Sequence, residues 1–586
     1  MRTEEIISYA MADKKASLIL RGGKVANVYT RELIDADVVI ADNYIVYVGK
    51  NTDDFKGEKT QIIKLEDKVI CPGLIESHIH VESSMLSLTE FSKVVVSKGT
   101  TTCVIDPHEI ANVCGIQGIN LFIEESKELP VKFLIEAPSC VPSLSGFETP
   151  GAELDVNKII KLLKKDEIFG LAEMMNFPGV YLRFPDVLGK IDAAKKSKKI
   201  VEGHAPLLTN KELQAYIAAG ISSDHEATTA EEALEKLRLG MKLQIREGSF
   251  AKDLENIFSD LIKYDIDYRN IIIASDDRNP IDLVEKGHLD YSFRKLVKLG
   301  VDPIKALQMF TINTATHLKL DDKIGGISPG KIADIVVVND LENFNVEMTI
   351  IEGKIVYREN KVQQNIIRKK YPKSVLETMK FFEVPSIHDL MIEGEEEEIR
   401  VNVIGLKEHS LITEHLQLKL KAIDGYLQPD LEQDILPVFV INRHTPEKNI
   451  GKGFIKGLGI KEGALASTIS HDCHQVICTG TSYKLILQAL QKIKEIGGGQ
   501  VVVTKNSVVT LPLKIAGLMS TETSSEVVKK IRTINQELKK LQPALSEPFM
   551  ALAFVALPVI PHLKITDKGL VNVDTFGFIE LKILEK

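Results

Sequence analysis

Residues 69–80 read Val-Ile-Cys-Pro-Gly-Leu-Ile-Glu-Ser-His-Ile-His. The apolar run predicts a buried strand, and two histidines stand at its end. Because side chains alternate along a strand, His78 and His80 face the same side. Two imidazoles on one side of a strand end make half of a metal site, although a structural strand that carries two histidines by chance has the same pattern. Their partners elsewhere in the chain decide between these interpretations.

The segment 70–320 alternates short apolar strands with helical stretches, for example 157–165 and 229–239. The second stretch follows Thr228-Thr229 and carries Glu231-Glu232 in its first turn, which is typical of a helix N-terminus. Eight strand candidates end near His80, Asp106, Pro138, Glu173, His204, His225, Arg246 and Asp276. Eight β-then-α units over roughly 250 residues predict a (β/α)8 TIM barrel.

Short strand patterns also flank this segment, at 17–65 and again at 329–356. Neither patch has enough strands for a stable sheet of its own. We therefore expect one small β domain, built from residues 1–69 and 321–365, with the barrel (70–320) inserted in it.

Downstream we expect a linker with an acidic loop, residues 366–399, and a C-terminal α/β domain, residues 400–586. The acidic run Glu393–Glu398 predicts a solvated loop. A helix is expected over 482–496, ended by the glycines 497–499, with a strand at 500–504. The chain contains no Gly-x-x-x-x-Gly-Lys-[Ser/Thr] pattern, which argues against an NTPase.

The composition excludes several classes of protein. The chain has 586 residues, 44% of them hydrophobic, and its net charge of −9 argues against a general nucleic-acid binder. Neither a signal peptide nor an apolar run long enough to span a membrane is present. The six cysteines are scattered without a Cys-x-x-Cys motif. We expect a cytoplasmic protein without nucleic-acid or membrane partners.

Metal-ligating residue types gather at the predicted strand ends. His78 and His80 end the first strand, Glu173 the fourth, His204 the fifth, His225 the sixth and Asp276 the eighth. These ends meet at one mouth of a TIM barrel, where active sites lie. Six groups exceed the three protein ligands of a single catalytic zinc and suit two divalent ions bridged by a carboxylate. Imidazole and carboxylate ligands together suit Zn, Fe(II) or Mn.

The metal motifs resemble those of the amidohydrolase superfamily. Longer stretches at 72–85, 106–113, 275–278, 469–475 and 511–520 are similar to those of bacterial and archaeal adenine deaminases, and the resemblance covers nearly the whole chain. It implies hydrolysis of adenine to hypoxanthine and ammonia in purine salvage. It also implies two divalent ions, with Mn or Fe(II) favoured over Zn, and a homo-oligomer.

The resemblance further assigns the ligands. It implies that His78, His80 and Asp276 hold one ion, that His204 and His225 hold the other, and that Glu173 bridges them. A glutamate at 173 departs from the carboxylated lysine of hydantoinases and dihydroorotases, which argues against a cyclic-amide hydrolase. With an ion-activated hydroxide as nucleophile, Asp276 is the expected general base.

Other residues have open roles. The acid that protonates the ring is Glu226, Glu109 or Glu82. Additional metal or substrate contacts are expected among Glu82, His108, Glu109, Asp277, His471 and His474. His108 could instead orient a ligand histidine. The His471–His474 segment could shield the substrate from water, or it could be a polar turn of the C-terminal domain.

Two alternatives remain at this stage. The first is another amidohydrolase, such as a guanine, cytosine or isoaspartyl-type enzyme, which the metal residues alone do not separate. The second is a catalytically inactive nucleobase-binding paralogue, against which the complete ligand set argues. A nucleic-acid deaminase is disfavoured because its His/Cys/Cys zinc signature is absent.

Overall fold

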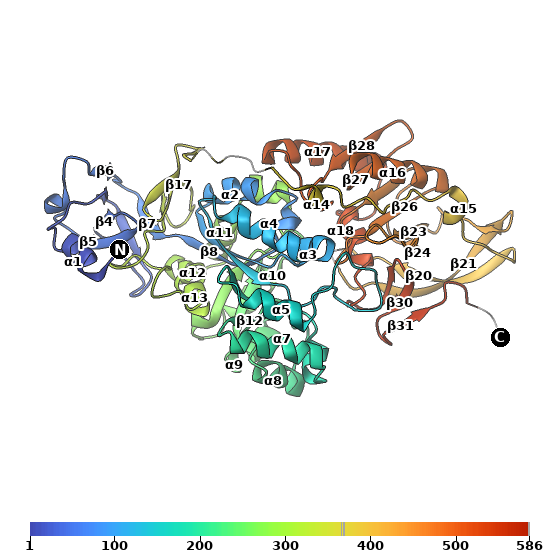
Figure 1. Cartoon of the computed structure of the whole chain (residues 1–586), viewed down its shortest axis with the longest axis horizontal. Coiled ribbons are helices and arrows are strands. Elements are labelled where there is room, and N and C mark those ends of the chain that lie inside the picture. Colours follow the sequence, from blue (N-terminus) through green and yellow to red (C-terminus); the bar gives the residue numbers. More distant parts are fainter. Residues whose placement is uncertain (365, 367–369, 409, 584–586) are drawn as a thin grey trace.

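The computed structural model describes residues 1–364, 366, 370–408 and 410–583. Residue 365, the last of the expected small β domain, and residues 367–369, at the expected start of the linker, lie outside the described residues, as do 409 and 584–586, which fall in the expected C-terminal domain. Along the long axis of the molecule, the N-terminal sheets come first, the barrel lies in the middle and the C-terminal region lies at the far end (Figure 1).

The middle of the chain forms the predicted barrel. Its parallel strands are β8 (Leu74–Ile79), β9 (Thr100–Ile105), β10 (Lys132–Ala137), β11 (Ile168–Met174), β12 (Ile200–Gly203), β13 (Ser223–Asp224), β14 (Lys242–Arg246) and β15 (Ile271–Ala274). They pair in the orders β12-β11-β10-β9-β8 and β13-β14-β15. Asp276 N donates to His78 O (3.1 Å) and His80 N donates to Asp276 O (3.2 Å), which joins β15 to β8. On the other side, Ser222 N donates to Val201 O (3.0 Å). The predicted TIM barrel is confirmed.

Helices follow the strands and cover the outside of the barrel. They are α2 (Leu88–Val96), α3 (His108–Cys114), α4 (Ile116–Ser126), α5 (Val156–Leu163), α6 (Phe177–Tyr181), α7 (Pro185–Lys196), α8 (Asn210–Ala218), α9 (Ala230–Arg238), α10 (Asp253–Leu261), α11 (Leu289–Lys298), α12 (Pro303–Met309) and α13 (Ile312–His317). The Thr229 side chain caps α9 by accepting from Glu232 N, so this predicted helix start is confirmed.

Both flanks of the barrel contribute to one seven-stranded sheet, ordered β19-β18-β17-β16-β7-β2-β3. Its strands are β2 (Lys24–Asn27), β3 (Glu32–Asp35), β7 (Val69–Pro72), β16 (Ile335–Val338), β17 (Val346–Ile351), β18 (Lys354–Arg358) and β19 (Lys361–Val362). β16 pairs antiparallel with β7, with Val337 opposite Ile70. A second sheet, β5-β4-β1-β6, is formed by β1 (Leu18–Arg21), β4 (Asp37–Ala41), β5 (Tyr44–Gly49) and β6 (Gln61–Lys64). β7 leads directly into the first barrel strand.

The expected linker carries two short helices, α14 (Lys373–Leu376) and α15 (Ile387–Leu390), whose Val375 and Leu390 side chains are fully buried. The acidic residues 395–398 are exposed and lead into the next sheet. The domain boundaries proposed from the sequence stay a prediction.

The C-terminal region is built on a nine-stranded sheet, ordered β22-β21-β20-β24-β23-β26-β25-β27-β28. Its strands are β20 (Glu398–Gly405), β21 (Glu414–Ile423), β22 (Tyr426–Leu427), β23 (Ile435–Ile441), β24 (Ile450–Lys456), β25 (Ala464–Ser467), β26 (Val476–Gly480), β27 (Gly499–Val503) and β28 (Val508–Pro512). α16 (Tyr483–Ile496) ends at Gly497, whose φ of 77° is left-handed, as the glycine triplet predicted. α17 (Ser524–Lys540), α18 (Pro548–Val555) and the hairpin strands β29 (Leu563–Thr566), β30 (Gly569–Asn572) and β31 (Gly577–Ile579) complete the region.

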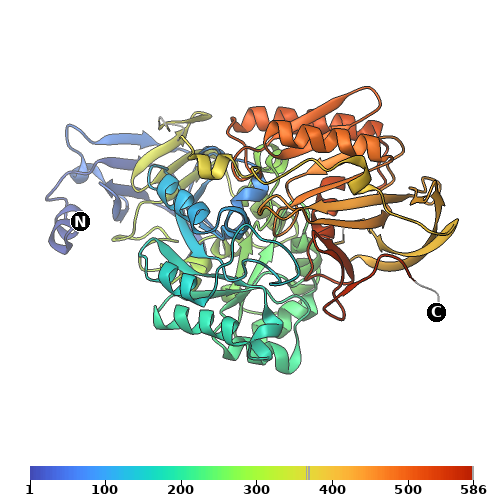
Figure 2. The same cartoon turned by 45° about the vertical axis from the view of Figure 1, so that its right-hand side comes forward.

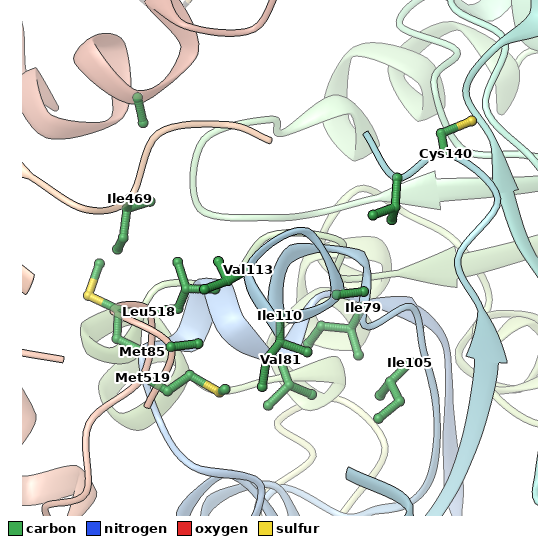
Figure 3. Close-up of a cluster of buried hydrophobic side chains, with 14 of the residues drawn as sticks. Ile79, Val81, Met85, Ile105, Ile110, Val113, Cys140, Ile469, Leu518 and Met519 are labelled. Atoms are coloured by element: carbon green, nitrogen blue, oxygen red, sulfur yellow. The ribbon is translucent and has the colours of Figure 1, made fainter. Parts of the chain in front are cut away.

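The C-terminal region packs against the mouth of the barrel, as the turned view shows (Figure 2). One cluster of buried apolar side chains crosses the boundary: Leu518 and Met519 lie beside Met85, which follows the first barrel strand (Figure 3). Ser520 N also donates to Met85 O (2.8 Å). Burial of apolar surface on both sides therefore joins the two parts. No helix among the described residues has the length and apolarity needed to cross a bilayer.

Gly203→Ala is predicted to destabilise the barrel at the junction of β12 and β13. A Cβ at Gly203 would lie 2.2 Å from Ser223 O, a backbone atom that cannot move without disturbing the strand pair. We expect a loss of about 3 kcal/mol, seen as a lower midpoint of thermal unfolding. Gly577→Ala is the matched control, because its Cβ would meet no atom closer than 3.8 Å. Equal midpoints for the two variants would contradict the packing argument.

Candidate metal centre

The residues predicted to hold the first ion converge at the barrel mouth. The Nε2 atoms of His78 and His80 lie 3.2 Å apart, and His80 Nε2 lies 3.3 Å from Asp276 Oδ1. All three side chains are buried. Asp276 adopts a φ of 55°, a left-handed backbone that costs a non-glycine residue about 1–3 kcal/mol. The same residue closes the barrel, so the closing hydrogen bonds hold its carboxylate beside the two histidines.

The second predicted pair lies beside the first. His204 Nδ1 and His225 Nε2 are 3.3 Å apart, and the rings of His78 and His225 stack with centroids 4.2 Å apart. Glu173 lies between the two pairs. Its Oε2 is 2.7 Å from His204 Nδ1 and 3.1 Å from His225 Nε2, whereas its Oε1 is 3.4 Å from His80 Nε2. All six predicted ligands therefore meet in one place.

The donor set fits divalent cations. Ring nitrogens and carboxylate oxygens point at one another in a buried space, where a positive ion is needed to offset the converging lone pairs. Four overlapping groups have donor atoms close enough to share an ion: His78-His80-Asp276, His78-Glu173-His225, His204-His225-Glu226 and His80-Asp106-His108-Glu173. The cluster can therefore bind metal, and its chemistry does not select one element.

Charge partners decide the protonation of the two central carboxyl groups. Burial acts to raise the pKa of Asp276, but a hydrogen bond with His80 and the charge of Arg246 hold it well below its usual range. Burial likewise opposes ionisation of Glu173, and His204 and His225 hold the pKa of that carboxyl well below its usual range. Both side chains are therefore carboxylates, the form that binds cations.

Glu226 and Arg246 form a pair at the edge of the cluster. Glu226 Oε1 lies 3.6 Å from both His204 Nδ1 and His225 Nε2, and it accepts a hydrogen bond from Arg246. Arg246 Nη1 also lies 3.2 Å from Asp276 Oδ2. The sequence predicted Arg246 only as a strand end. Its position at the carboxyl end of the seventh strand was the signal that could have identified it.

Three acidic side chains, Glu82, Glu109 and Asp277, lie next to the cluster, and we call them the acidic group. Ser83 Oγ donates to Asp277 and to Glu109 Oε1 (3.1 Å for the latter). Burial, followed by the charge of Glu109, raises the pKa of Glu82 to about 8. Burial, followed by the charge of Asp276, raises the pKa of Asp277 to about 6. The predicted contacts Glu82, Glu109 and Asp277 are thus brought together.

The remaining predicted contacts join the barrel to the C-terminal region. His108 Nδ1 lies 3.3 Å from Asp106 Oδ2 and 3.5 Å from Glu173 Oε1, and its Nε2 lies 3.9 Å from Asp472 Oδ1. The sequence did not single out Asp106 or Asp472. Each lies in a motif that carries histidines, Asp106-Pro107-His108 and His471-Asp472-Cys473-His474, which was the available signal.

His471 and His474 reach the acidic group from the C-terminal side. His471 Nδ1 lies 3.9 Å from Glu109 Oε1, and His474 Nε2 lies 3.9 Å from Glu109 Oε2. Two segments far apart in the sequence therefore share one polar surface at the barrel mouth.

A buried lysine supports the loops that carry His204 and His225. Lys236 Nζ is fully buried and donates to Asp224 Oδ2 (2.7 Å), Glu232 Oε1 (2.7 Å) and Ala205 O (2.9 Å). Asp224 in turn accepts from Ala205 N (2.7 Å) and from Glu226 N (3.2 Å). The backbone after β12 and β13 is thereby tied to one charged centre.

Comparison with known proteins identifies two family models in the chain. Residues 69–356 match the amidohydrolase family, and residues 410–577 match the adenine deaminase C-terminal domain. The chain is 41% identical to an adenine deaminase of Methanococcoides burtonii, over 96% of this chain and 96% of that protein. It is 40% identical to an adenine deaminase of Dehalococcoides mccartyi, over 98% of each. An adenine deaminase of Methanothrix thermoacetophila is 39% identical over 99% of this chain and 100% of that protein.

Lys236→Met is predicted to destabilise the protein by about 3–5 kcal/mol, because it leaves Asp224 and Glu232 buried without a counter-charge. Thermal and denaturant unfolding measure the effect. Lys263→Met is the control: Lys263 pairs with Asp260 at the surface, where an ion pair contributes little. Equal stability of the two variants would show that the buried network does not support these loops.

Proposed function

The chain belongs to the adenine deaminase family, and we propose that it hydrolyses adenine to hypoxanthine and ammonia at a centre of two divalent ions. The observation that carries the proposal is the position of Glu173 between two histidine pairs, with one carboxylate oxygen facing each. A carboxylate in that position suits a bridge between two ions. It also differs from the modified lysine of cyclic-amide hydrolases.

In this proposal, each ion has its own residues. His78, His80 and Asp276 would hold the first, His204 and His225 would hold the second, and Glu173 would serve both. Support comes from the distances of 2.7–3.7 Å between these donor atoms. Mn or Fe(II) is favoured over Zn because of the family resemblance, since the donor types suit all three.

Divalent ions held by these residues would supply Lewis-acid chemistry that lowers the pKa of a water molecule, the nucleophile proposed for C6 of adenine. Asp276 accepts the proton of that water and passes it toward a ring nitrogen or the leaving amine. Glu226, Glu109 and Glu82 are the candidates for the acid that protonates the ring. Glu226 accepts a hydrogen bond from Arg246, whereas burial raises the pKa of Glu82 to about 8, which favours Glu82 as the proton donor.

The acidic group and the His471–His474 segment flank the place where substrate would lie. We propose that His108, Asp277, His471 and His474 contact adenine or order the groups that do. Because the C-terminal region packs on the barrel mouth, it also excludes bulk water from the reaction.

We further propose that the reaction takes place in the cytoplasm as part of purine salvage, carried out by a homo-oligomer. The six cysteines are all free thiols, which supports a reducing compartment. The net charge of −9 is unsuited to nucleic-acid binding. Gel filtration with light scattering measures the oligomeric state.

Incubation with adenine and Mn²⁺ tests the activity. The purified protein should convert the adenine spectrum to that of hypoxanthine and release one ammonia per base, and removal of metal by chelation should abolish both changes. A set of purines and pyrimidines serves as the comparison. Turnover of guanine or cytosine without turnover of adenine would contradict the proposal, and no turnover of any base with little bound metal would favour an inactive relative.

Asp276→Asn is predicted to lower kcat by about 10²–10⁴-fold, the range of a lost general base, while retaining part of the metal. Steady-state kinetics and elemental analysis measure the two effects. Asp260→Asn is the control, because its carboxylate pairs with Lys263 at the surface. Near-wild-type turnover in Asp276→Asn would exclude the proposed role.

Glu173→Gln is predicted to lower the metal content from two ions per chain to one or fewer. An amide loses the negative charge that allows one group to serve two cations. Elemental analysis of protein reconstituted with Mn²⁺ measures the content without reference to activity, and Glu167→Gln, an exposed change near the start of the same strand, is the control. Two tightly held ions in Glu173→Gln would contradict the bridging role.

A further inference from the structure

Arg443 is a fully buried guanidinium in the C-terminal region. It follows β23, and no carboxylate among the described residues forms an ion pair with it. Its donors go to neutral acceptors instead: Nε to His474 O, Nη2 to Ala516 O (2.9 Å) and Nη1 to Thr378 Oγ1 (3.1 Å). Burial lowers its pKa to about 10. A buried charge without a counter-ion is costly, so its retention calls for a reason beyond packing.

One acceptor of Arg443, the carbonyl of His474, belongs to the segment that faces the candidate metal centre. We name residues Ser470–Gln475 the His471 loop. Arg443 binds the carbonyl of His474 through its side chain, and its backbone N donates to Gln475 Oε1 (2.9 Å). The neighbouring His444 Nε2 lies 2.6 Å from Cys473 O. Two consecutive side chains therefore hold two consecutive carbonyls of the His471 loop.

This loop supplies the C-terminal contacts of the site. It carries His471, whose Nδ1 lies 3.9 Å from Glu109 Oε1, and Asp472, whose Oδ1 lies 3.9 Å from His108 Nε2. These two buried side chains face the barrel mouth only if the loop backbone keeps its conformation. The ring of His471 also stacks on Phe554 at 4.5 Å and His471 N donates to Ala553 O (3.1 Å), so α18 holds one end of the loop while Arg443 and His444 hold the other.

Through its Nη2 atom, Arg443 binds a second segment that contacts the barrel. Ala516 O accepts from Nη2, and Ser520 N, four residues on, donates to Met85 O (2.8 Å) after the first barrel strand. Between them, Gly517 leaves room for the guanidinium, since a Cβ at Gly517 would lie 2.8 Å from Nη1. One buried charge thus joins two of the C-terminal segments that contact the barrel.

We propose that Arg443 is a positioning residue for the deamination, which places His471 and Asp472 against His108 and Glu109 by holding the carbonyls of the His471 loop and of Ala516. The inference rests on the proposed function. Arg443 itself touches neither the metal ligands nor the space between them, so it acts through the loop.

The first test compares Arg443→Met and Arg443→Lys with Thr479→Val. The control removes a buried hydrogen bond within the sheet, from Thr479 Oγ1 to Pro437 O, which involves no residue of the His471 loop. Kinetics are measured with adenine on metal-saturated protein, well below each unfolding midpoint. We expect kcat of Arg443→Met to fall by about 10²-fold, the cost of misplaced groups, with two ions still bound. Arg443→Lys should recover part of this loss, because an ammonium can still donate to carbonyls.

The outcomes separate a positioning role of Arg443 from a merely structural one. They also separate this inference from the proposed function. A merely structural Arg443 would lower the unfolding midpoint and leave kcat of the folded, metal-loaded enzyme at the level of Thr479→Val, which would overturn the inference. Absence of adenine turnover in the wild-type protein would instead contradict the proposed function. Loss of metal from Arg443→Met would also overturn the inference, because the ligands lie in the barrel.

A second test changes Gly517, the residue that packs against the guanidinium of Arg443. Gly517→Ala should displace Nη1 and lower kcat, and it also strains a backbone whose φ is 75°. In kcat, the double variant Gly517→Ala with Arg443→Met should be no slower than Arg443→Met alone, because both changes act on one contact, whereas the backbone strain should lower the unfolding midpoint. Multiplied losses in the double variant would show that the glycine acts independently of Arg443.

Discussion

Two backbone hydrogen bonds between Asp276 and the His78–His80 segment join the last barrel strand to the first. The same two bonds bring together the residues of the candidate metal centre. Asp276, the residue that makes them, also supplies a carboxylate to the cluster. Its left-handed backbone is strained, so the surrounding strands must hold it in place. The stability of the barrel and the geometry of the centre therefore depend on the same contact.

Without cations, the converging carboxylates and imidazoles lower the stability of the folded state. Each is removed from water, and among the described residues only Arg246 adds a permanent positive charge to the group. Bound ions would stabilise the native state by linkage, because the unfolded chain has no such site. The barrel must nevertheless hold its shape before ions bind, and two apolar clusters, one around β8–β12 and the other around β14 and β15, provide that support.

Much of this was predictable from local sequence patterns. The eight strands, the cap at Thr229 and the six predicted ligands each follow from short motifs whose meaning depends on periodicity and position in the barrel. Arg246, Asp106 and Asp472 were harder to assign, because their importance comes from contacts made only in three dimensions. Arg443 carried no sequence signal at all: the pattern around it is that of a strand end, and its acceptors lie 31 and 73 residues further on.

The site is divided between segments that are distant in the chain. His108 and Glu109 begin a barrel helix, whereas His471 and Asp472 belong to a loop more than halfway through the C-terminal sheet. Contacts of 3.9 Å between weakly tethered loops would average out with small motions. The arrangement needs a rigid interface, and the structure provides one in three forms: the apolar cluster around Met85, the hydrogen bond from Ser520, and the carbonyls held by Arg443. In the proposed function the C-terminal region is thereby part of the active site, which would explain why a chain with a complete barrel devotes a further nine-stranded sheet to it.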